Sequence, residues 1–497
     1  MEASLRRMKK PDDTRVDARL AREIAQREGV KLVLAPSIGE VGGVYLLSAA
    51  LVDPVRGTAL RAESARAHSR REIFDALDNL TQQIRADLGE VSSSIASEAK
   101  PLSQVTTSSL DALKMFSLGQ QRARAGKFDE ARALYERALE IDPRFTAARG
   151  SLGMIEFEFV DRKAGRDLLT QAVAEADNLT DVEQYTSKAF YATIVENDLP
   201  KAVDAWRALL ALYPDVGTAH NNLGRVYLLM KRYEDASSAF SKAIELDPYL
   251  MPSYFNLEEI YLEHEGDPEA ALELCKKQLM YNDQDVWAYV HSGEAYLGLD
   301  RLEDAREAFE HALALGPAYV DVLKPLGSTY RLLGRYQDAL RTFRRVQEVD
   351  ERQVVADYDA GIVYSLIGDE AEARRSFDRF RRSTERLAAN GPRDARYVFD
   401  LALVWSRLGD RTRGWSLAQT ASGLDRTHYY DLARVLAVQG RTGPALRMLD
   451  LAVKEGFRDI IRMKIDPDLA SLAKTPNFQE LVATRHHPPP SREPRPF

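Results

Sequence analysis

The sequence predicts a mostly α-helical protein, in which a superhelix of about ten helical repeats follows a small α+β domain. The main observation is a tyrosine that recurs at steps of 34 or 35 residues. Alanine and aromatic positions keep nearly the same step. The three series are Tyr227, Tyr261, Tyr296, Tyr330 and Tyr364; Ala236, Ala271, Ala305, Ala339 and Ala373; and Phe240, Cys275, Phe309, Phe343 and Phe377. A fixed period in this range indicates stacked units, none of which can bury its apolar face alone.

The part of the chain before the repeats shows a different pattern. Residues 1–16 are polar and are expected to be disordered, and 17–91 are expected to form the α+β domain. Gly42-Gly43 joins two apolar runs, which suits a tight hairpin because glycine tolerates positive φ. The expected elements, in order, are a helix over 16–28, strands over 31–39, 44–53 and about 58–65, and a helix over 71–90.

The rest of the chain divides into four segments. A stretch rich in Ser and Thr, 92–108, is expected to be a linker, and the repeats are expected over 109–457. The segment 458–483 leaves the period and is expected to be a helical cap, because the end of a solenoid otherwise exposes apolar surface. The Pro-rich tail, 484–497, is expected to be disordered.

The clearest repeat spans 217–248 and shows how each unit is built. Two helices are expected, separated near Lys231-Arg232, and Pro248 prevents the second from continuing. Gly224 and Ala236 are small, so the two helices can cross closely beside Phe240. Further along the chain, the step from Ala373 to Gly414 is 41 residues, which predicts a lengthened helix or a kink around ERLAANGPRD. Cys275 takes the place of a repeated Phe and is expected to be a buried packing residue.

The repeats resemble the tetratricopeptide repeat at its large, small, aromatic and Pro positions. The match recurs in SLGQQRARAGKFDEARALYERALEIDP and in YVHSGEAYLGLDRLEDAREAFEHALALGP. The order of parts, with REGVKLVLAPSIGEVGGVYLLSAALVDPVRGTAL before the repeats and FRDIIRMKIDPDLASLAKTPNFQELV after them, is similar to the C-terminal sensor region of bacterial eukaryotic-like serine/threonine kinases and related winged-helix regulators. Its strand part resembles the amino-terminal domain of the periplasmic Tol-associated propeller protein, although the domain here begins late.

The kinase itself has no counterpart in this chain. There is no Gly-rich loop with a Val-Ala-x-Lys strand, no His-Arg-Asp loop and no Asp-Phe-Gly. There is also no GxxxxGK[ST] and no His-Glu-x-x-His, so no catalytic, cofactor-binding or metal-binding residue is predicted. Glu258-Glu259 are expected to be surface charge, and His486-His487 to lie in a solvated tail.

Composition narrows the partners and the location. The net charge of −8 argues against nucleic acid, which favours a basic stripe. No run approaches the ~18 apolar residues of a membrane span, and no apolar segment follows the basic N-terminus as it would in a signal peptide. A cytoplasmic location is therefore expected, or an extracytoplasmic one if the chain is a truncated kinase sensor region.

The predicted site is the concave groove that the first helices line in repeats of this type. Asn222 and Asn256 share one offset, and an Asn amide can both donate to and accept from the backbone of an extended peptide. His291 follows at the same offset, with Phe255 and Tyr358 at neighbouring groove positions. The site residues predicted are Asn222, Arg225, Asn256, Trp287, His291, Lys324 and Arg331. This mix of basic and aromatic groups suits an acidic or C-terminal peptide.

Three functions follow from this organisation. The leading hypothesis is a noncatalytic scaffold that binds a peptide or protein in the groove. The alternative is a detached or truncated sensory arm of a bacterial serine/threonine kinase or winged-helix regulator, with such a protein as partner. An enzyme with an unrecognised site is the third, and it is disfavoured because no titratable cluster recurs along the repeats.

Overall fold

A computed structural model gives the structure of the chain. Apart from the isolated residues Met8 and Pro101, it describes residues 16–27, 29–90, 107–124, 127–176, 179–317, 319–350, 353–390, 394–424 and 428–483. Most of the predicted N-terminal disordered stretch and linker, and all of the predicted C-terminal tail, lie outside the described residues. The chain forms two compact units, Met1–Asp247 and Pro248–Phe497, which are described separately.

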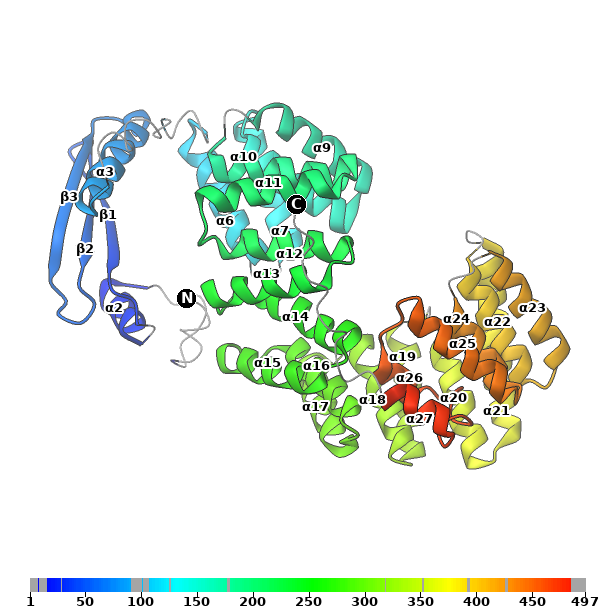
Figure 1. Cartoon of the computed structure of the whole chain (residues 1–497). Coiled ribbons are helices and arrows are strands. Elements are labelled where there is room, and N and C mark those ends of the chain that lie inside the picture. Colours follow the sequence, from blue (N-terminus) through cyan, green and yellow to red (C-terminus); the bar gives the residue numbers. More distant parts are fainter. Residues whose placement is uncertain are drawn as a thin grey trace, which may run out of the picture. The chain divides into compact units, whose positions relative to one another are not determined.

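The first unit opens with the small domain, which is a helix followed by a three-stranded antiparallel meander and a second helix (Figure 1). Its elements are α2 (Ala18–Arg27), β1 (Val33–Val41), β2 (Val44–Val52), β3 (Ala59–Ala67), the 3-10 turn η1 (Arg70–Glu72) and α3 (Ile73–Asp87). The expected elements are therefore present. Gly42 and Gly43 form the hairpin with φ of 60° and 81°, which explains why glycine stands at both positions.

Helix α3 covers the face of the sheet that carries the inward side chains of β2 (Figure 1). Leu47, Ala49 and Leu51 alternate on β2 and are buried, as expected for a strand with one packed face. Leu34 and Ile38 of the edge strand β1 pair with Leu51 and Leu47 and remain more than half exposed. The core of this domain is therefore small and centred on β2.

The remainder of the first unit is a series of antiparallel helix pairs, of which four are described. The helices are α6 (Leu110–Arg124), α7 (Phe128–Ile141), α8 (Thr146–Ile155), α9 (Arg162–Ala174), α10 (Asp181–Tyr191), α11 (Leu199–Leu212), α12 (Gly217–Leu229) and α13 (Tyr233–Leu246). Short π-helical segments, η2 (Glu156–Val160) and η4 (Ala192–Glu196), lengthen α8 and α10.

The second unit continues the series with six described pairs and two final helices. They are α14 (Met251–Glu259), extended by the π-helical η5 (Ile260–Glu265), α15 (Pro268–Tyr281), α16 (Val286–Gly298), α17 (Leu302–Leu315), α18 (Val320–Leu332), α19 (Tyr336–Val349), α20 (Val355–Ile367), α21 (Glu370–Asn390), α22 (Ala395–Arg407), α23 (Arg411–Leu424), α24 (Tyr429–Val438), α25 (Thr442–Lys454), α26 (Ile460–Ile465) and α27 (Pro476–Ala483). The described residues thus hold ten helix pairs, in agreement with the predicted number.

A glycine on the first helix and an aromatic ring on the second make the same contact in several pairs. A Cβ built on Gly293 would lie 2.6 Å from the ring of Phe309, and one on Gly224 would lie 2.7 Å from Phe240. The equivalent glycines in the other pairs with this contact are Gly119, Gly327 and Gly361. The period in the sequence therefore reflects one repeated helix crossing, which requires a residue without a Cβ.

Two local predictions are also confirmed. Helix α21 has 21 residues against 13 or 14 in the neighbouring pairs, which accounts for the longer interval before Gly414. Cys275 is a free thiol with no exposed surface, and burial raises its pKa well above the ordinary value. The residue is therefore a packing residue, as expected.

Candidate functional site

The first helices of the second unit pack side by side, and a pocket of about 270 Å³ opens on the surface that they form. We call this pocket the acidic pocket. It is lined by one face each of α14 with η5, α16 and α18: Phe255, Glu259, Leu262, Glu263, Trp287, Val290, His291, Glu294, Asp321, Lys324 and Pro325. Within each helix most of these residues are three or four apart, the spacing that places side chains on one helical face.

Aromatic rings form one wall of the acidic pocket. Phe255 and Trp287 meet edge to face with ring centroids 5.4 Å apart, and His291 packs against Phe255 at 4.9 Å. Trp287 keeps 37% of its surface exposed, whereas nearly all other aromatic residues of this unit that the structure describes are buried or partly buried. An exposed aromatic wall next to polar groups is typical of a recognition surface rather than of a core.

A buried ion pair lies behind this wall. His291 Nδ1 is 2.7 Å from a carboxylate oxygen of Glu258, and both residues are buried. Burial lowers the pKa of His291, but the hydrogen bond and the charge of Glu258 outweigh it, so the pKa is raised above its ordinary value. The prediction of Glu258 as surface charge is wrong. The side chain of Glu258 lies on the inward face of α14, where His291 neutralises its carboxylate.

Three glutamates line the pocket, Glu259, Glu263 and Glu294. No hydrogen bond or ion pair links them to another residue in the described part of the chain. Desolvation raises the pKa of all three, and for Glu263 the charges of Glu259, Asp459 and Glu294 add to it and bring the value to about 7. Glu263 keeps an exposed side chain, so solvent screening will reduce its shift.

The same helical surface holds a segment of the chain itself further along the unit. We call residues 459–472, which include α26, the C-terminal segment. Arg331 of α18 donates to the carbonyl oxygen of Ile465 at 2.9 Å, and Lys464 donates to the carbonyl of Gly298 at 3.3 Å. In Figure 1, α26 and α27 (red) lie against the helices of this unit. The segment thus crosses successive first helices.

Two aspartates fix this segment in a set of arginine and tyrosine side chains that we call the arginine–tyrosine box: Tyr358, Arg407, Tyr430 and Arg434. The carboxylate of Asp468 accepts from Tyr358 at 2.6 Å, Arg407 at 2.7 Å and Arg434 at 2.9 Å. Asp466 accepts from Tyr430 at 2.8 Å. Burial opposes ionisation of Asp468, but the two guanidinium groups outweigh it and hold its pKa below the usual range.

Apolar side chains attach the C-terminal segment to the last helix pair. Ile460, Met463, Leu469 and Leu472 are buried together with residues of α24 and α25. The stretch 458–483, predicted as a cap, therefore covers the last pair and also extends back to η5 and α16, where Ile461 packs in one cluster with Leu262 and Ala295.

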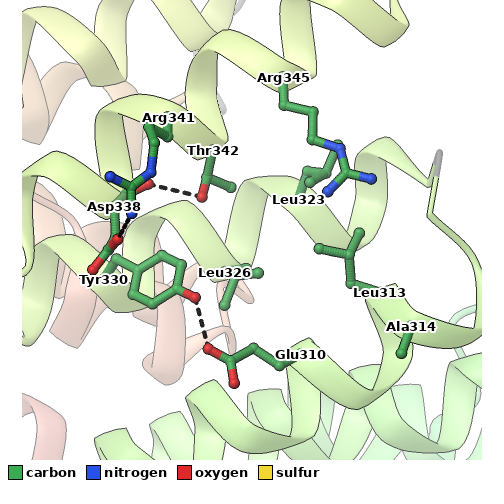
Figure 2. Close-up of a pocket in the computed structure, with 10 residues that line it drawn as sticks. All are labelled: Glu310, Leu313, Ala314, Leu323, Leu326, Tyr330, Asp338, Arg341, Thr342 and Arg345. Atoms are coloured by element: carbon green, nitrogen blue, oxygen red, sulfur yellow. Dashed lines mark hydrogen bonds and ion pairs between the residues drawn. The ribbon is translucent and has the colours of Figure 1, made fainter.

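A larger pocket, of about 480 Å³, lies among α17, α18 and α19 (Figure 2). Its charged groups are already paired with one another: Tyr330 donates to Glu310 at 2.6 Å, and Arg341 forms an ion pair with Asp338. Arg345 donates to the carbonyl of Pro317 at 2.6 Å. Because its polar groups are already hydrogen-bonded within the protein, this pocket has fewer groups available to bind a ligand than the acidic pocket has.

The structure separates the seven predicted site residues into different environments. Trp287, His291 and Lys324 line the acidic pocket together, and Arg331 holds the C-terminal segment. The amide of Asn256 donates to the carbonyl of Pro252 in its own helix at 2.7 Å.

Asn222 and Arg225 belong to the first unit. Asn222 accepts from Asn221 at 3.4 Å, and Arg225 lies 3.6 Å from Glu158. Neither residue of that unit lines the acidic pocket.

The prediction from sequence missed the carboxylates of the acidic pocket and, in the arginine–tyrosine box, every residue except Tyr358, which it placed at a groove position. The signal for the carboxylates was present: Glu259 follows Phe255 by four residues, and Glu294 follows Trp287 by seven, so each shares a face with its aromatic residue. No local pattern could find the box, since Tyr358 and Asp468 are 110 residues apart.

Comparison with known proteins supports the nature of the repeats. Models of the tetratricopeptide repeat match residues 112–145, 218–250, 262–324, 323–354 and 427–450. The chain is 26% identical over 146 residues to anaphase-promoting complex subunit 7 of Dictyostelium discoideum, covering 29% of this chain and 24% of that protein. It is 26% identical over 149 residues to the protein O-mannosyl-transferase TMTC3 of Mus musculus, covering 27% of this chain and 16% of that protein.

A solved tetratricopeptide-repeat protein from Parabacteroides merdae is 16% identical, with a TM-score of 0.42, over 52% of this chain and 99% of that one. The chain spans about a quarter or less of the length of the curated relatives named above. Fold and repeats together define a mostly helical solenoid protein that contains tetratricopeptide repeats. The likeness to kinase sensor regions stays a prediction, because the matched models describe the repeat alone. Within the described ranges, no helix has both the length and the apolar character required to cross a membrane.

Proposed function

We propose that the protein is a noncatalytic interaction scaffold, and that the first helices of its second unit bind an extended peptide segment of a partner protein. The observation that carries this proposal is the C-terminal segment, because the same row of helices already holds a stretch of chain. Arg331 and the arginine–tyrosine box bind it through a backbone carbonyl and two carboxylates. A pre-formed surface of this kind binds without a large ordering cost on its own side.

The acidic pocket is the part of this surface that remains available. It adjoins the start of the C-terminal segment, where Ile461 packs in the same cluster as Leu262, and its three glutamates form no hydrogen bond or ion pair in the described chain. The exposed ring of Trp287 gives it an anchor of the kind that is enriched in binding hot spots. A partner peptide would therefore contact α14, α16 and α18.

A selection from a random peptide library, made on the full chain, tests this proposal. We expect selected peptides to lose at least tenfold in affinity for a Phe255→Ala/Trp287→Ala variant. Glu307→Ala, on the second helix α17 and outside the pocket, is the matched control and should bind as the parent does. Thermal unfolding of each variant verifies that it is folded. Peptides that bind all three proteins equally would refute the proposed binding surface.

A further inference from the structure

The charge of the acidic pocket is opposite to that of the arginine–tyrosine box. Glu259, Glu263 and Glu294 bring three carboxylates to one cavity, and Asp321 and Lys324 from α18 offset each other. Asp459, at the start of the C-terminal segment, adds to the negative potential at Glu263 and Glu294. In the neighbouring buried pair, the charges of Glu258 and His291 cancel each other, so the pocket keeps its negative charge.

Two further features of the pocket indicate a ligand. Phe255 and Trp287 present ring surface beside the carboxylates, and aromatic faces attract ammonium and guanidinium groups. His291 is 4% exposed, and its Nδ1 bonds Glu258, whereas its Nε2 has no hydrogen-bond partner in the part of the chain that is described. This second nitrogen remains for an acceptor on a bound molecule, such as a peptide carbonyl.

The size and spacing of these groups favour an organic cation. The volume of about 270 Å³ is below the roughly 300–1,000 Å³ of typical small-molecule sites, so it suits a single long side chain. Among the residues that the structure describes, no group of His, Cys, Asp or Glu is arranged to hold a metal ion. An apolar stem against the rings with a charged head among the carboxylates matches lysine or arginine.

We propose that the acidic pocket binds the lysine or arginine side chain of a partner peptide that lies along α14, α16 and α18. This inference rests on the proposed function and specifies its partner. It also revises the expectation of an acidic peptide, since the basic groups that suggested one are partly used by the C-terminal segment. The partner segment is then basic, and its charge complements the pocket rather than the arginine–tyrosine box.

The test uses the peptides selected on the full chain and a Glu259→Gln/Glu294→Gln variant. We expect selected peptides to share a lysine or arginine, and replacing it by norleucine to weaken binding at least tenfold, the scale of a charge-assisted contact. The glutamine variant should lose binding to a similar extent. Its thermal midpoint should stay equal or rise, because the change removes carboxylates that repel each other. Glu307→Gln, which removes one carboxylate outside the pocket, serves as the control.

The possible outcomes distinguish a failure of this inference from a failure of the proposed function on which it rests. If peptides depend on Phe255 and Trp287 but share no basic residue, or bind the glutamine variant within twofold, the cation pocket is wrong and the binding surface stands. If free lysine amide competes as well as the peptide, the pocket binds cations without reading a peptide, which also contradicts the proposal. If no selected peptide depends on Phe255 and Trp287, both fail.

Discussion

Replacement of Asp468 by asparagine should release the C-terminal segment from the helices that hold it. The side chain of Asp468 has no exposed surface and accepts hydrogen bonds from Tyr358, Arg407 and Arg434. Asp468→Asn keeps the shape and removes the charge, so the largely buried guanidinium group of Arg407 loses its counter-ion. Arg434 loses one of its carboxylate partners and keeps Asp466 and Asp431. Breaking a buried pair on one side costs about 3–5 kcal/mol. That energy corresponds to an increase in segment opening on the order of 10²- to 10⁴-fold.

Hydrogen–deuterium exchange followed by mass spectrometry measures this opening directly. Peptides that cover 459–472 should exchange on the order of 10²-fold faster or more in Asp468→Asn, whereas peptides from α14 and α15 should change little. Asp450→Asn is the matched control, because Asp450 forms only an exposed pair with Lys454 on α25. An Asp468→Asn protein whose segment exchanges within threefold of the parent would refute the view that this box holds the segment.

The direction of the pH dependence follows from the same contacts. The pKa of Asp468 in the folded protein lies below the ordinary value of 3.8. Its contribution to stability is therefore present above that ordinary value and is lost as the pH falls through the lower folded pKa. Segment protection should accordingly persist from neutral pH to about pH 4 and decrease below it.

Three further predictions concern the second unit. Gly293→Ala should destabilise it by about 1–3 kcal/mol in urea unfolding, because the added methyl group would overlap an aromatic ring. Gly423→Ala has open space around it and should be neutral or stabilising by up to about 1 kcal/mol. Equal effects of the two substitutions would contradict the repeated helix crossing. Cys275 should resist iodoacetamide until the protein unfolds, since its thiol is buried and its pKa is raised, and rapid labelling of the native chain by mass spectrometry would count against that burial. The raised pKa of His291 gives stability that is present below its ordinary pKa of 6.5 and is lost as the pH rises through the folded value. The thermal midpoint of the parent should therefore fall more between pH 6.5 and 8.5 than that of a Glu258→Gln/His291→Gln variant. Parallel curves for the two proteins would exclude the pair as the cause.

Much of the fold could be predicted from the sequence because it is recorded in local and regularly repeated residues. The glycine at the helix crossing and the aromatic ring beside it recur in several of the units, and the tyrosine and alanine series keep nearly the same step, so the period indicates a stack of helix pairs. Gly42-Gly43 likewise fixes its hairpin, because few other residues adopt positive φ twice in succession. The site was only partly predictable: His291 lies at the predicted groove offset, Trp287 and Lys324 lie at neighbouring groove positions, and these positions bring the three residues to one pocket.

The tertiary structure decided what that offset faces. Only packing shows that Glu258 turns inward to His291 while Glu259, its neighbour, faces the pocket. Only the path of the chain end shows that Asp466 and Asp468 occupy the arginine–tyrosine box, since their partners lie 34 to 110 residues away. Sequence periodicity is set by neighbours within one repeat, whereas the charge of a groove depends on side chains from several repeats and on what already fills it. For that reason the sequence by itself determined the scaffold, and the tertiary structure decided which part of its surface is open and which sign of charge it presents.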